Sequence, residues 1–298
     1  MTTHLIGVDW GTSSLRAARL DPAGGVLEER SLPRGILTVP AGGFPAVFDE
    51  ACGDWMREPG ALALICGMAG SRQGWVEAPY AACPAGFADI AAQLTWIEPG
   101  RIALVPGLAC EEHGVPDVMR GEETQVFGAL ELLDLRSALL VLPGTHSKWV
   151  RVIDGAIDRF ATFMTGECYA LLRQHSILAR MMPPEDGELE AAAFAQGVHH
   201  ARRSGTLLHA AFSARTLALF ERLDPAALPS YLSGLVIGEE LRAQHLRGTL
   251  SVAVVGAQAL TRRYELALST LGITVTSVGS QATWRGLRAI ASTLQGTS

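Results

Sequence analysis

The sequence has few charged and few aromatic side chains. Of its 298 residues, 18% are charged and 6% are aromatic, whereas 48% are hydrophobic. A chain with this much apolar material and this little charge can bury a large core, which excludes an intrinsically disordered protein. The length fits one large domain or two domains of medium size, and we start from the expectation of two.

Long basic runs and long apolar runs are also missing. The net charge is −6, and no basic run is long enough to follow a phosphate backbone, so we expect no nucleic-acid partner. The longest apolar stretches, such as 207–220, are interrupted by polar or charged residues, and the N-terminus lacks a basic region followed by an apolar one. We therefore expect a cytoplasmic protein that binds a small molecule and no membrane.

Paired cysteines are absent as well. The five cysteines are odd in number and isolated, with no Cys-x-x-Cys pair that would hold zinc. We interpret them as reduced thiols that mostly fill the core: Cys52, Cys66, Cys83, Cys110 and Cys168.

What the sequence does contain is an alternation of strand and helix patterns, which predicts a mixed α/β fold. It begins with an apolar strand, a Gly-Thr-Ser-Ser turn at 11–14 and a second strand, which together predict a β-hairpin with Asp9 at its mouth. The periodicity then predicts helices and strands in turn: a helix at 44–55, a strand at 61–66, a helix at 87–94, a strand at 102–105 and a helix opening near Glu122.

A similar order begins again at Ser137, with a strand, a Gly-Thr-His-Ser turn at 144–147, two further strands and then helices. The two turns are about 133 residues apart, which is too long a period for a solenoid. We interpret this as a diverged internal repeat that forms two domains facing each other. The expected limits are 1–136 and 137–282, with a last helix at 283–298 that returns to the first domain.

Turns built from glycine and hydroxyl residues expose backbone N–H groups that bind anionic oxygens. Two facing turns of this kind could hold one polyphosphate, although such turns often only connect strands. Asp9 lies at a strand end, where a carboxylate is well placed to hold Mg²⁺ through water; the alternative is a turn cap. Lys148 follows the second turn and could neutralise phosphate charge, or it could simply be exposed to solvent.

Seven segments carry a resemblance to a known family, and they occur in the same order over nearly the whole chain. They are VDWGTSSLRA, GMAGSRQGWVEAPY, VPGL, VMRGEETQVFGAL, LPGTHSKWV, FMTGECYALL and VVGAQALTRRY. Together they resemble the bacterial 2-dehydro-3-deoxygalactonokinases. The resemblance implies two ribonuclease-H-like domains of the actin-type ATPase class that close over ATP in a central cleft. It also implies phosphorylation of the 6-hydroxyl of 2-dehydro-3-deoxy-D-galactonate, a step of galactonate breakdown.

The resemblance also implies which residues bind ATP and Mg²⁺. Those expected at the phosphates are Gly11, Thr12, Ser13, Gly144, Thr145, His146, Ser147 and Lys148. Gly256 and Ala257 resemble the segment that contacts adenosine, where glycine lets the backbone approach the base. In the second turn, Leu142 occupies the position that corresponds to Asp9, so we expect metal binding to depend on Asp9.

The segment after the strand that ends at Cys66 is expected to bind the sugar acid, because open α/β sheets place ligands at such strand ends. The candidates for substrate binding are Gly70, Ser71, Arg72, Trp75 and Arg120. Arg72 and Arg120 are the alternatives for gripping the substrate carboxylate with a bidentate guanidinium. Arg72 could equally be a surface arginine, and Trp75 could be packing alone.

Two glutamates open the helix that follows Arg120. Acidic residues commonly favour a helix N-terminus, but the phosphohydrolase branch of the superfamily carries a similar Gly-x-Glu-Glu string at its catalytic position. The apolar stripe of this helix points roughly 35° from Glu123 and roughly 65° from Glu122. We therefore predict Glu123 as the base and Glu122 as support for Arg120 or for the metal's waters. Glu167, at another helix start, is interpreted as structural.

Three alternatives to this function remain open at the level of sequence: a kinase for another 2-keto-3-deoxy sugar acid, an actin-like ATPase, and a phosphohydrolase that uses water as acceptor. The oligomeric state is also open, with a homodimer as one possibility.

Overall fold

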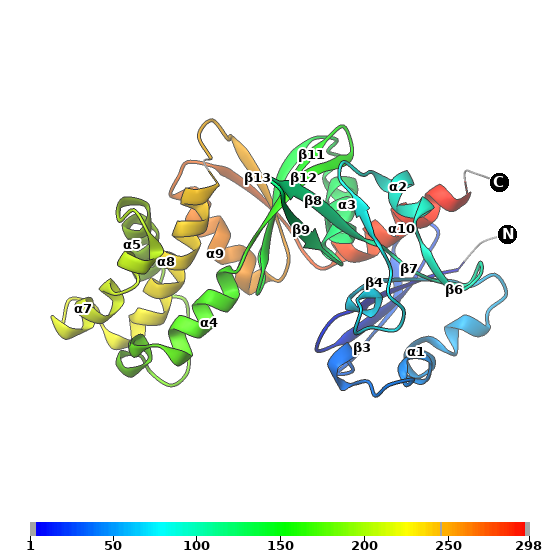
Figure 1. Cartoon of the computed structure of the whole chain (residues 1–298), viewed down its shortest axis with the longest axis horizontal. Coiled ribbons are helices and arrows are strands. Elements are labelled where there is room, and N and C mark those ends of the chain that lie inside the picture. Colours follow the sequence, from blue (N-terminus) through cyan, green and yellow to red (C-terminus); the bar gives the residue numbers. More distant parts are fainter. Residues whose placement is uncertain (1–3, 245, 296–298) are drawn as a thin grey trace. The chain divides into compact units, whose positions relative to one another are not determined.

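The computed structural model of the chain describes residues 4–244 and 246–295 (Figure 1). The strands are β1 (Leu5–Trp10), β2 (Leu15–Leu20), β3 (Val26–Leu32), β4 (Leu62–Gly67), β5 (Tyr80–Ala82), β6 (Thr95–Glu98), β7 (Ile102–Leu104), β8 (Gly107–Glu112), β9 (Val115–Met119), β10 (Ala138–Leu142), β11 (Ser147–Ile153), β12 (Ala156–Phe163), β13 (Ser251–Val255) and β14 (Thr274–Val278).

The α-helices are α1 (Phe44–Cys52), α2 (Phe87–Ala92), α3 (Glu122–Leu133), α4 (Thr165–His175), α5 (Ala191–Arg203), α6 (Leu207–Ala210), α7 (Ser213–Leu219), α8 (Leu228–Ala243), α9 (Gln258–Ser269) and α10 (Gln281–Gln295). Five short 3₁₀ helices lie in the connections: η1 (Ile36–Thr38), η2 (Trp55–Arg57), η3 (Met68–Gly70), η4 (Ile177–Met181) and η5 (Pro225–Ala227). Within the described ranges, no helix is both long enough and apolar enough to cross a membrane.

The chain divides into two compact units. The first contains the chain up to Leu140, Val150–Ala161 and the chain from Val278; the second contains Val141–Trp149 and Thr162–Ser277. These units differ from the domain limits expected from the repeat at 137–140, 150–161 and 278–282, and those limits stay a prediction. Residues 296–298 of the expected last helix lie outside the described residues.

The expected hairpin forms the centre of a six-stranded sheet with the order β3-β2-β1-β4-β7-β6. Strand β1 pairs antiparallel with β2 and parallel with β4, and β4 pairs parallel with β7. In this register Asp9 lies opposite Arg16 on one side and opposite Cys66 on the other. The pairing therefore places Asp9 at the carboxyl end of a central strand.

The five-stranded sheet has the order β12-β11-β10-β13-β14. Numbered within their own sheets, these strands follow the order third, second, first, fourth, fifth. The first four positions of the six-stranded sheet follow the same order, and the sheet then continues with its sixth and fifth strands, β7 and β6. The mixed α/β class and the two related sheets expected from the repeat are thus confirmed, in agreement with the ribonuclease-H-like architecture that the resemblance implies.

A third sheet, β5-β8-β9, was not predicted. Strand β5 has three residues, and the exposed stretch of β8 and β9 lacks a strictly alternating apolar pattern, so their periodicity gave no signal. Gly107, at the start of β8, pairs with Tyr80. This small sheet presents Tyr80 to the segment that precedes α3, where it contributes to the site described below.

The core of the first unit contains an aromatic cluster beneath the hairpin. The ring of Trp10 lies 5.3 Å from that of Phe44 and 6.1 Å from that of Trp75, and the ring of Trp75 lies 5.5 Å from that of Phe48. In the second unit, the packing of α8 against α5 forms the largest helical contact. Rings packed at these distances bury much apolar area and hold the strand ends rigidly.

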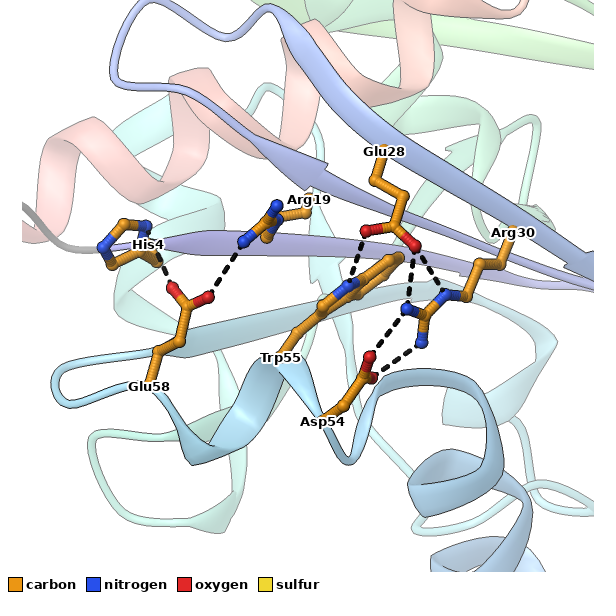
Figure 2. A network of polar contacts seen from close by, with 7 residues as sticks. All are labelled: His4, Arg19, Glu28, Arg30, Asp54, Trp55 and Glu58. Carbon is orange, nitrogen blue, oxygen red and sulfur yellow. Dashed lines mark hydrogen bonds and ion pairs between the residues drawn. The ribbon is translucent and has the colours of Figure 1, made fainter.

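A network of polar contacts on the outer strands ties the six-stranded sheet to η2 (Figure 2). Arg30 on β3 lies 2.7 Å from Asp54 and 2.8 Å from Glu28, and the indole of Trp55 donates to Glu28 at 3.2 Å. The hydrogen bond from Arg30 lowers the pKa of Asp54 to about 2. Glu58 completes the network with Arg19 and His4. These pairs anchor the connection to β4, away from the sheet ends that carry the site.

Candidate active site

Asp9 is held in place by an arginine of the neighbouring strand. Nη2 of Arg16 donates to Oδ2 of Asp9 at 2.6 Å, and the Arg16 guanidinium also lies over the ring of Trp284 of α10, 5.4 Å from its centroid. Both side chains of the pair are partly exposed. The carboxylate thus has one oxygen fixed by a charged partner and keeps the bonding capacity of the other.

Two glycines let the end of β4 and the start of α3 meet beside Asp9. Gly67 has φ +90°, and a Cβ there would lie 2.8 Å from the carbonyl oxygen of Trp10 and 3.4 Å from Oδ1 of Asp9. Gly121 has φ +100°, and its Cβ would lie 3.1 Å from Cα of Gly67. Only glycine takes these backbone angles at so close an approach. The first turn of α3 therefore begins next to the Asp9 strand end.

Glu123 is fully buried in that first turn. Its Oε2 accepts from the backbone N–H of Gly121 at 2.6 Å, and its Oε1 accepts from the hydroxyl of Thr124 at 3.0 Å. Burial, helped by the charge of Glu122, raises the pKa of Glu123 to about 8. The inward orientation of Glu123 predicted from the apolar stripe is confirmed, and its role as a base stays a prediction.

Glu122 points less deeply inward and is partly exposed. Its Oε2 accepts from the backbone N–H of Arg120 at 3.0 Å, so it contacts the residue that the sequence analysis paired with it. The carboxylate caps the turn that carries Arg120 into the site.

Arg120 has unused donors. Its Nη2 donates to the carbonyl oxygen of Ala78 at 2.8 Å, and the guanidinium lies 4.4 Å from the ring centroid of Tyr80. Nε and Nη1 are shielded from solvent and have no hydrogen-bond partner among the described residues; the same holds for Oγ of Ser71. A Cβ at Gly70 would lie 2.9 Å from Nη1. Buried donors without partners are costly, so this cluster is suited to an anionic ligand that supplies the acceptors.

The other two candidates of the acceptor segment lie elsewhere. The side chain of Arg72 is 88% exposed, and its Nε lies 3.5 Å from Oε1 of Glu77. Trp75 packs in the aromatic cluster with Trp10 and Phe48. The structure thus brings Gly70 together with Arg120, and it brings neither Arg72 nor Trp75 into contact with that guanidinium.

Backbone hydrogen bonds fix the first turn, both within the turn and to η1. The N–H of Gly11 donates to the carbonyl oxygen of Ser14 at 2.9 Å, and the carbonyl oxygens of Gly11 and Thr12 accept from Ile36 at 3.0 Å and Leu37 at 3.3 Å. Thr12 and Ser13 are exposed. The turn therefore presents its outer residues from a fixed backbone.

The second turn is braced by α4. The carbonyl oxygen of Thr145 accepts from the N–H of Glu167 at 3.0 Å, and Nε2 of His146 lies 2.6 Å from Oε2 of Glu167. Lys148 is only 5% exposed, and its Nζ lies 3.5 Å from the carbonyl oxygen of His146. The alternative of a solvent-exposed lysine is therefore wrong. A Cβ at Gly256 would lie 3.9 Å from the carbonyl oxygen of Pro143, so the segment that precedes α9 runs beside this turn.

Sequence reasoning missed Glu240 of α8, a buried carboxylate beneath the second turn. Its oxygens accept from Ser147 at 2.8 Å, Trp149 at 2.6 Å, Tyr264 at 2.8 Å and also from Thr165. The sequence did contain one signal for Glu240, which is an acidic residue within the apolar run LSGLVIGEEL. The helical period of 3.6 residues places this glutamate on the inner face of the helix. The hydroxyl of Ser147 is thus engaged by Glu240, and Ser147 is fully buried.

Known proteins match this chain over nearly its whole length. A family described as 2-keto-3-deoxy-galactonokinase matches residues 9–290. The chain is 36% identical to the 2-dehydro-3-deoxygalactonokinase of Escherichia coli, with 98% of each chain covered. It is 39% identical to the protein named 2-dehydro-3-deoxygalactonokinase DgoK1 of Rhizobium meliloti, again with 98% of each chain covered.

A crystal structure from Sinorhizobium meliloti that carries the same kinase name superposes with a TM-score of 0.88 at 38% identity. The match covers 98% of this chain and 99% of that one. Full-length relatives above 30% identity and a family match over most of the chain lead to one assignment. The chain belongs to the 2-keto-3-deoxy-galactonokinase family.

Proposed function

We propose that this protein transfers the γ-phosphoryl group of ATP to the 6-hydroxyl of 2-dehydro-3-deoxy-D-galactonate. The family match supports a sugar-acid kinase with ATP as co-substrate. The observation that carries the proposal is the arrangement at the start of α3. There, Arg120 has two buried nitrogens without a hydrogen-bond partner, Nε and Nη1. The buried carboxylate of Glu123 lies three residues further along the chain.

Arg120 is proposed to bind the carboxylate of the sugar acid. Its free Nε and Nη1 can donate in the forked geometry that a carboxylate accepts, and Ser71 can add a hydroxyl. The contact with Tyr80 and the bond to Ala78 hold the guanidinium in one orientation. Arg72 has none of these features, since it is exposed and points to Glu77, so we favour Arg120 of the two alternatives.

Glu123 is proposed to take the proton of the attacking hydroxyl. In this step the acceptor oxygen forms a bond to the γ-phosphorus, the bond from that phosphorus to the β-phosphate oxygen breaks, and ADP leaves. The hydroxyl proton passes to Glu123, whose pKa of about 8 lies near the working range of a general base. Glu122 supports the same turn through its bond to Arg120.

Asp9 is proposed to hold Mg²⁺. Magnesium keeps several waters and needs only one or two carboxylates besides the phosphates. Asp9 fits this demand: Arg16 orients it through Oδ2, and no bulky side chain stands between Gly67 and Oδ1. The described residues contain no group of three or more metal ligands, so phosphate oxygens and waters would have to supply the remaining ligands. When bound, the ion would neutralise phosphate charge.

The ATP phosphates are proposed to bind the backbone of the two turns. The first contributes Gly11, Thr12 and Ser13. The second contributes 144–147, together with the charge of Lys148 and the imidazole of His146. Gly256 and Ala257 are proposed to contact the adenosine, because they run beside Pro143 of the second turn. Phosphoryl transfer depends mainly on such positioning and charge stabilisation.

A coupled assay of ADP release tests the proposal. The purified protein is given ATP and Mg²⁺ with each member of a panel of 2-keto-3-deoxy sugar acids, and with no acceptor. We expect ADP release that requires a sugar acid and is fastest with the galacto compound. A faster rate with another member assigns that substrate instead. ADP release that is equally fast without acceptor would indicate an ATPase or a phosphohydrolase and overturn the kinase proposal.

A further inference from the structure

We propose that Glu240 is a positioning residue for ATP, which holds the second turn and the adenosine segment in their binding arrangement. The inference rests on the proposed function, in which 144–148 and 256–257 contact ATP. Glu240 itself lies in the last turn of α8, and only 2% of it is exposed, so it acts through the residues that bond to it and makes no contact with ATP.

Four donors converge on this one carboxylate. Oε2 accepts from the hydroxyls of Ser147 at 2.8 Å and Tyr264 at 2.8 Å, and from that of Thr165. Oε1 accepts from the indole N–H of Trp149 at 2.6 Å. All four donors come from side chains and from elements other than α8.

The donors lie in the second turn or in elements that adjoin the segments assigned to ATP. Ser147 is the last residue of the second turn, and Trp149 lies on the strand that continues from it. Thr165 starts α4, whose Glu167 bonds to the carbonyl oxygen of Thr145. Tyr264 lies on α9, which begins just after Gly256 and Ala257. The carboxylate of Glu240 therefore connects three elements. Two of them, β11 and α4, support the second turn, and the third, α9, follows the adenosine segment.

A carboxylate is chemically suited to accept these four hydrogen bonds, whereas other side chains of similar size are not. It offers about four acceptor sites and no donor, which matches four incoming hydrogens. An apolar side chain of similar size would fill the space but leave four buried donors without an acceptor. A glutamine offers one acceptor oxygen and two N–H donors. With its oxygen toward the indole of Trp149, its amide N–H groups face the three hydroxyls, which must turn to accept and give up the bonds that they donate to the carboxylate. Loss of the charge should therefore loosen the turn without emptying the core.

The test is the kinetic and binding analysis of Glu240→Gln and Tyr264→Phe in the full chain. We expect Glu240→Gln to raise the KM for ATP and the Kd for ATP, measured calorimetrically without acceptor, by about tenfold. The KM for the sugar acid should stay near the wild-type value, and kcat should fall by less than about threefold. Tyr264→Phe removes one donor and should raise the KM for ATP in the same direction by a smaller factor.

The matched control is Val198→Ala. Val198 is a fully buried residue of α5 that packs against Gly234 and Gly238 of α8, and its side chain has no polar group that could take part in the bonds to Glu240. Its Tm should fall while the KM for ATP stays unchanged, which separates general destabilisation from positioning. If Glu240→Gln does not fold, Tyr264→Phe alone decides.

Two outcomes would overturn the inference. One is a KM for ATP within about twofold of wild type in Glu240→Gln, or in Tyr264→Phe if the first variant is not folded. The other is an equal rise in the KM of both substrates. Both outcomes are judged by comparison with a wild-type protein that is active in the same assay. A wild-type protein that binds no ATP would instead refute the proposed function.

Discussion

The two glycine turns lie on sheets that share the order of four strands, yet the charges around the turns are arranged differently. At the first turn the carboxylate of Asp9 comes from the strand itself, and Arg16 is its charged partner. At the second turn the corresponding position is Leu142, and the carboxylate comes from Glu240 on a helix.

The difference extends to how fully each acid is bonded. Glu123, near the first turn, accepts one backbone N–H and one hydroxyl, whereas Glu240 accepts from four side chains. Burial raises the pKa of both. The comparison teaches that one scaffold uses buried carboxylates in two ways. An acid with unfilled bonding capacity lies where protons and substrate are handled, and a saturated acid lies where a backbone must be held.

The largest expected effect is that of Glu123→Gln. The amide keeps the size of the side chain but cannot accept the hydroxyl proton, so kcat should fall by about 10²–10⁴ with little change in ATP binding. Steady-state kinetics and calorimetric titration of ATP check this. Glu122→Gln is the control and should do less. A larger loss in Glu122→Gln would reverse the two roles, and a loss below about threefold in both would place the base elsewhere.

The second effect concerns the unpaired donors of Arg120. A neutral 3-deoxy sugar lacks the carboxylate, so it should lose about 2–5 kcal/mol of transition-state binding, or roughly 30- to 4,000-fold in kcat/KM. Arg120→Lys should lower kcat/KM for the acid and leave the KM for ATP near wild type, because lysine lacks the guanidinium fork. The same measurements on Arg72→Lys should show a smaller loss. Equal rates with acid and neutral acceptors would remove Arg120 from the assignment.

The third effect is that of Asp9→Asn. Loss of the charge that holds Mg²⁺ should lower kcat by about 10² and shift the Mg²⁺ dependence to higher concentration. The rate is measured over a series of Mg²⁺ concentrations, and circular dichroism confirms that the fold is retained. Near-normal turnover at saturating Mg²⁺ would exclude Asp9 from the mechanism.

A fourth effect is on stability and depends on pH. The pKa of Glu123 rises from its ordinary 4.5 to about 8, so between these values the folded state holds a proton that the unfolded chain releases. This contribution to stability is complete below pH 4.5 and is lost as the pH rises through 8. Glu123→Gln escapes the loss, so above pH 8 it should be more stable than wild type by up to about 5 kcal/mol.

Urea unfolding of Glu123→Gln, Glu122→Gln and wild type at pH 5 and pH 8.5 checks this prediction. The gain should appear only for Glu123→Gln and only at the higher pH. The kcat/KM of the wild type should rise with pH over the same range, since the base works in its ionised form. A gain that is equal at both pH values would show that burial does not raise the pKa of Glu123.

Much of this arrangement could be predicted from local sequence. The β-hairpin at Asp9, the repeated turn and the inward Glu123 all follow from periods of two or 3.6 residues, which the chain encodes within a few positions. The choice between Arg72 and Arg120 could not be predicted. Both are arginines near glycine, and their difference lies in neighbours such as Tyr80, which is contributed by an unpredicted sheet.

By itself the sequence determined the α/β class, the repeat, the family and the segments that carry the candidate site, because these depend on the type and spacing of nearby residues. Only the tertiary structure decided which donors are left unpaired at Arg120, which charge orients Asp9, and that Glu240 of α8 lies beneath a turn nearly a hundred positions earlier. Burial and bonding saturation belong to contacts between distant segments, and no local pattern records them.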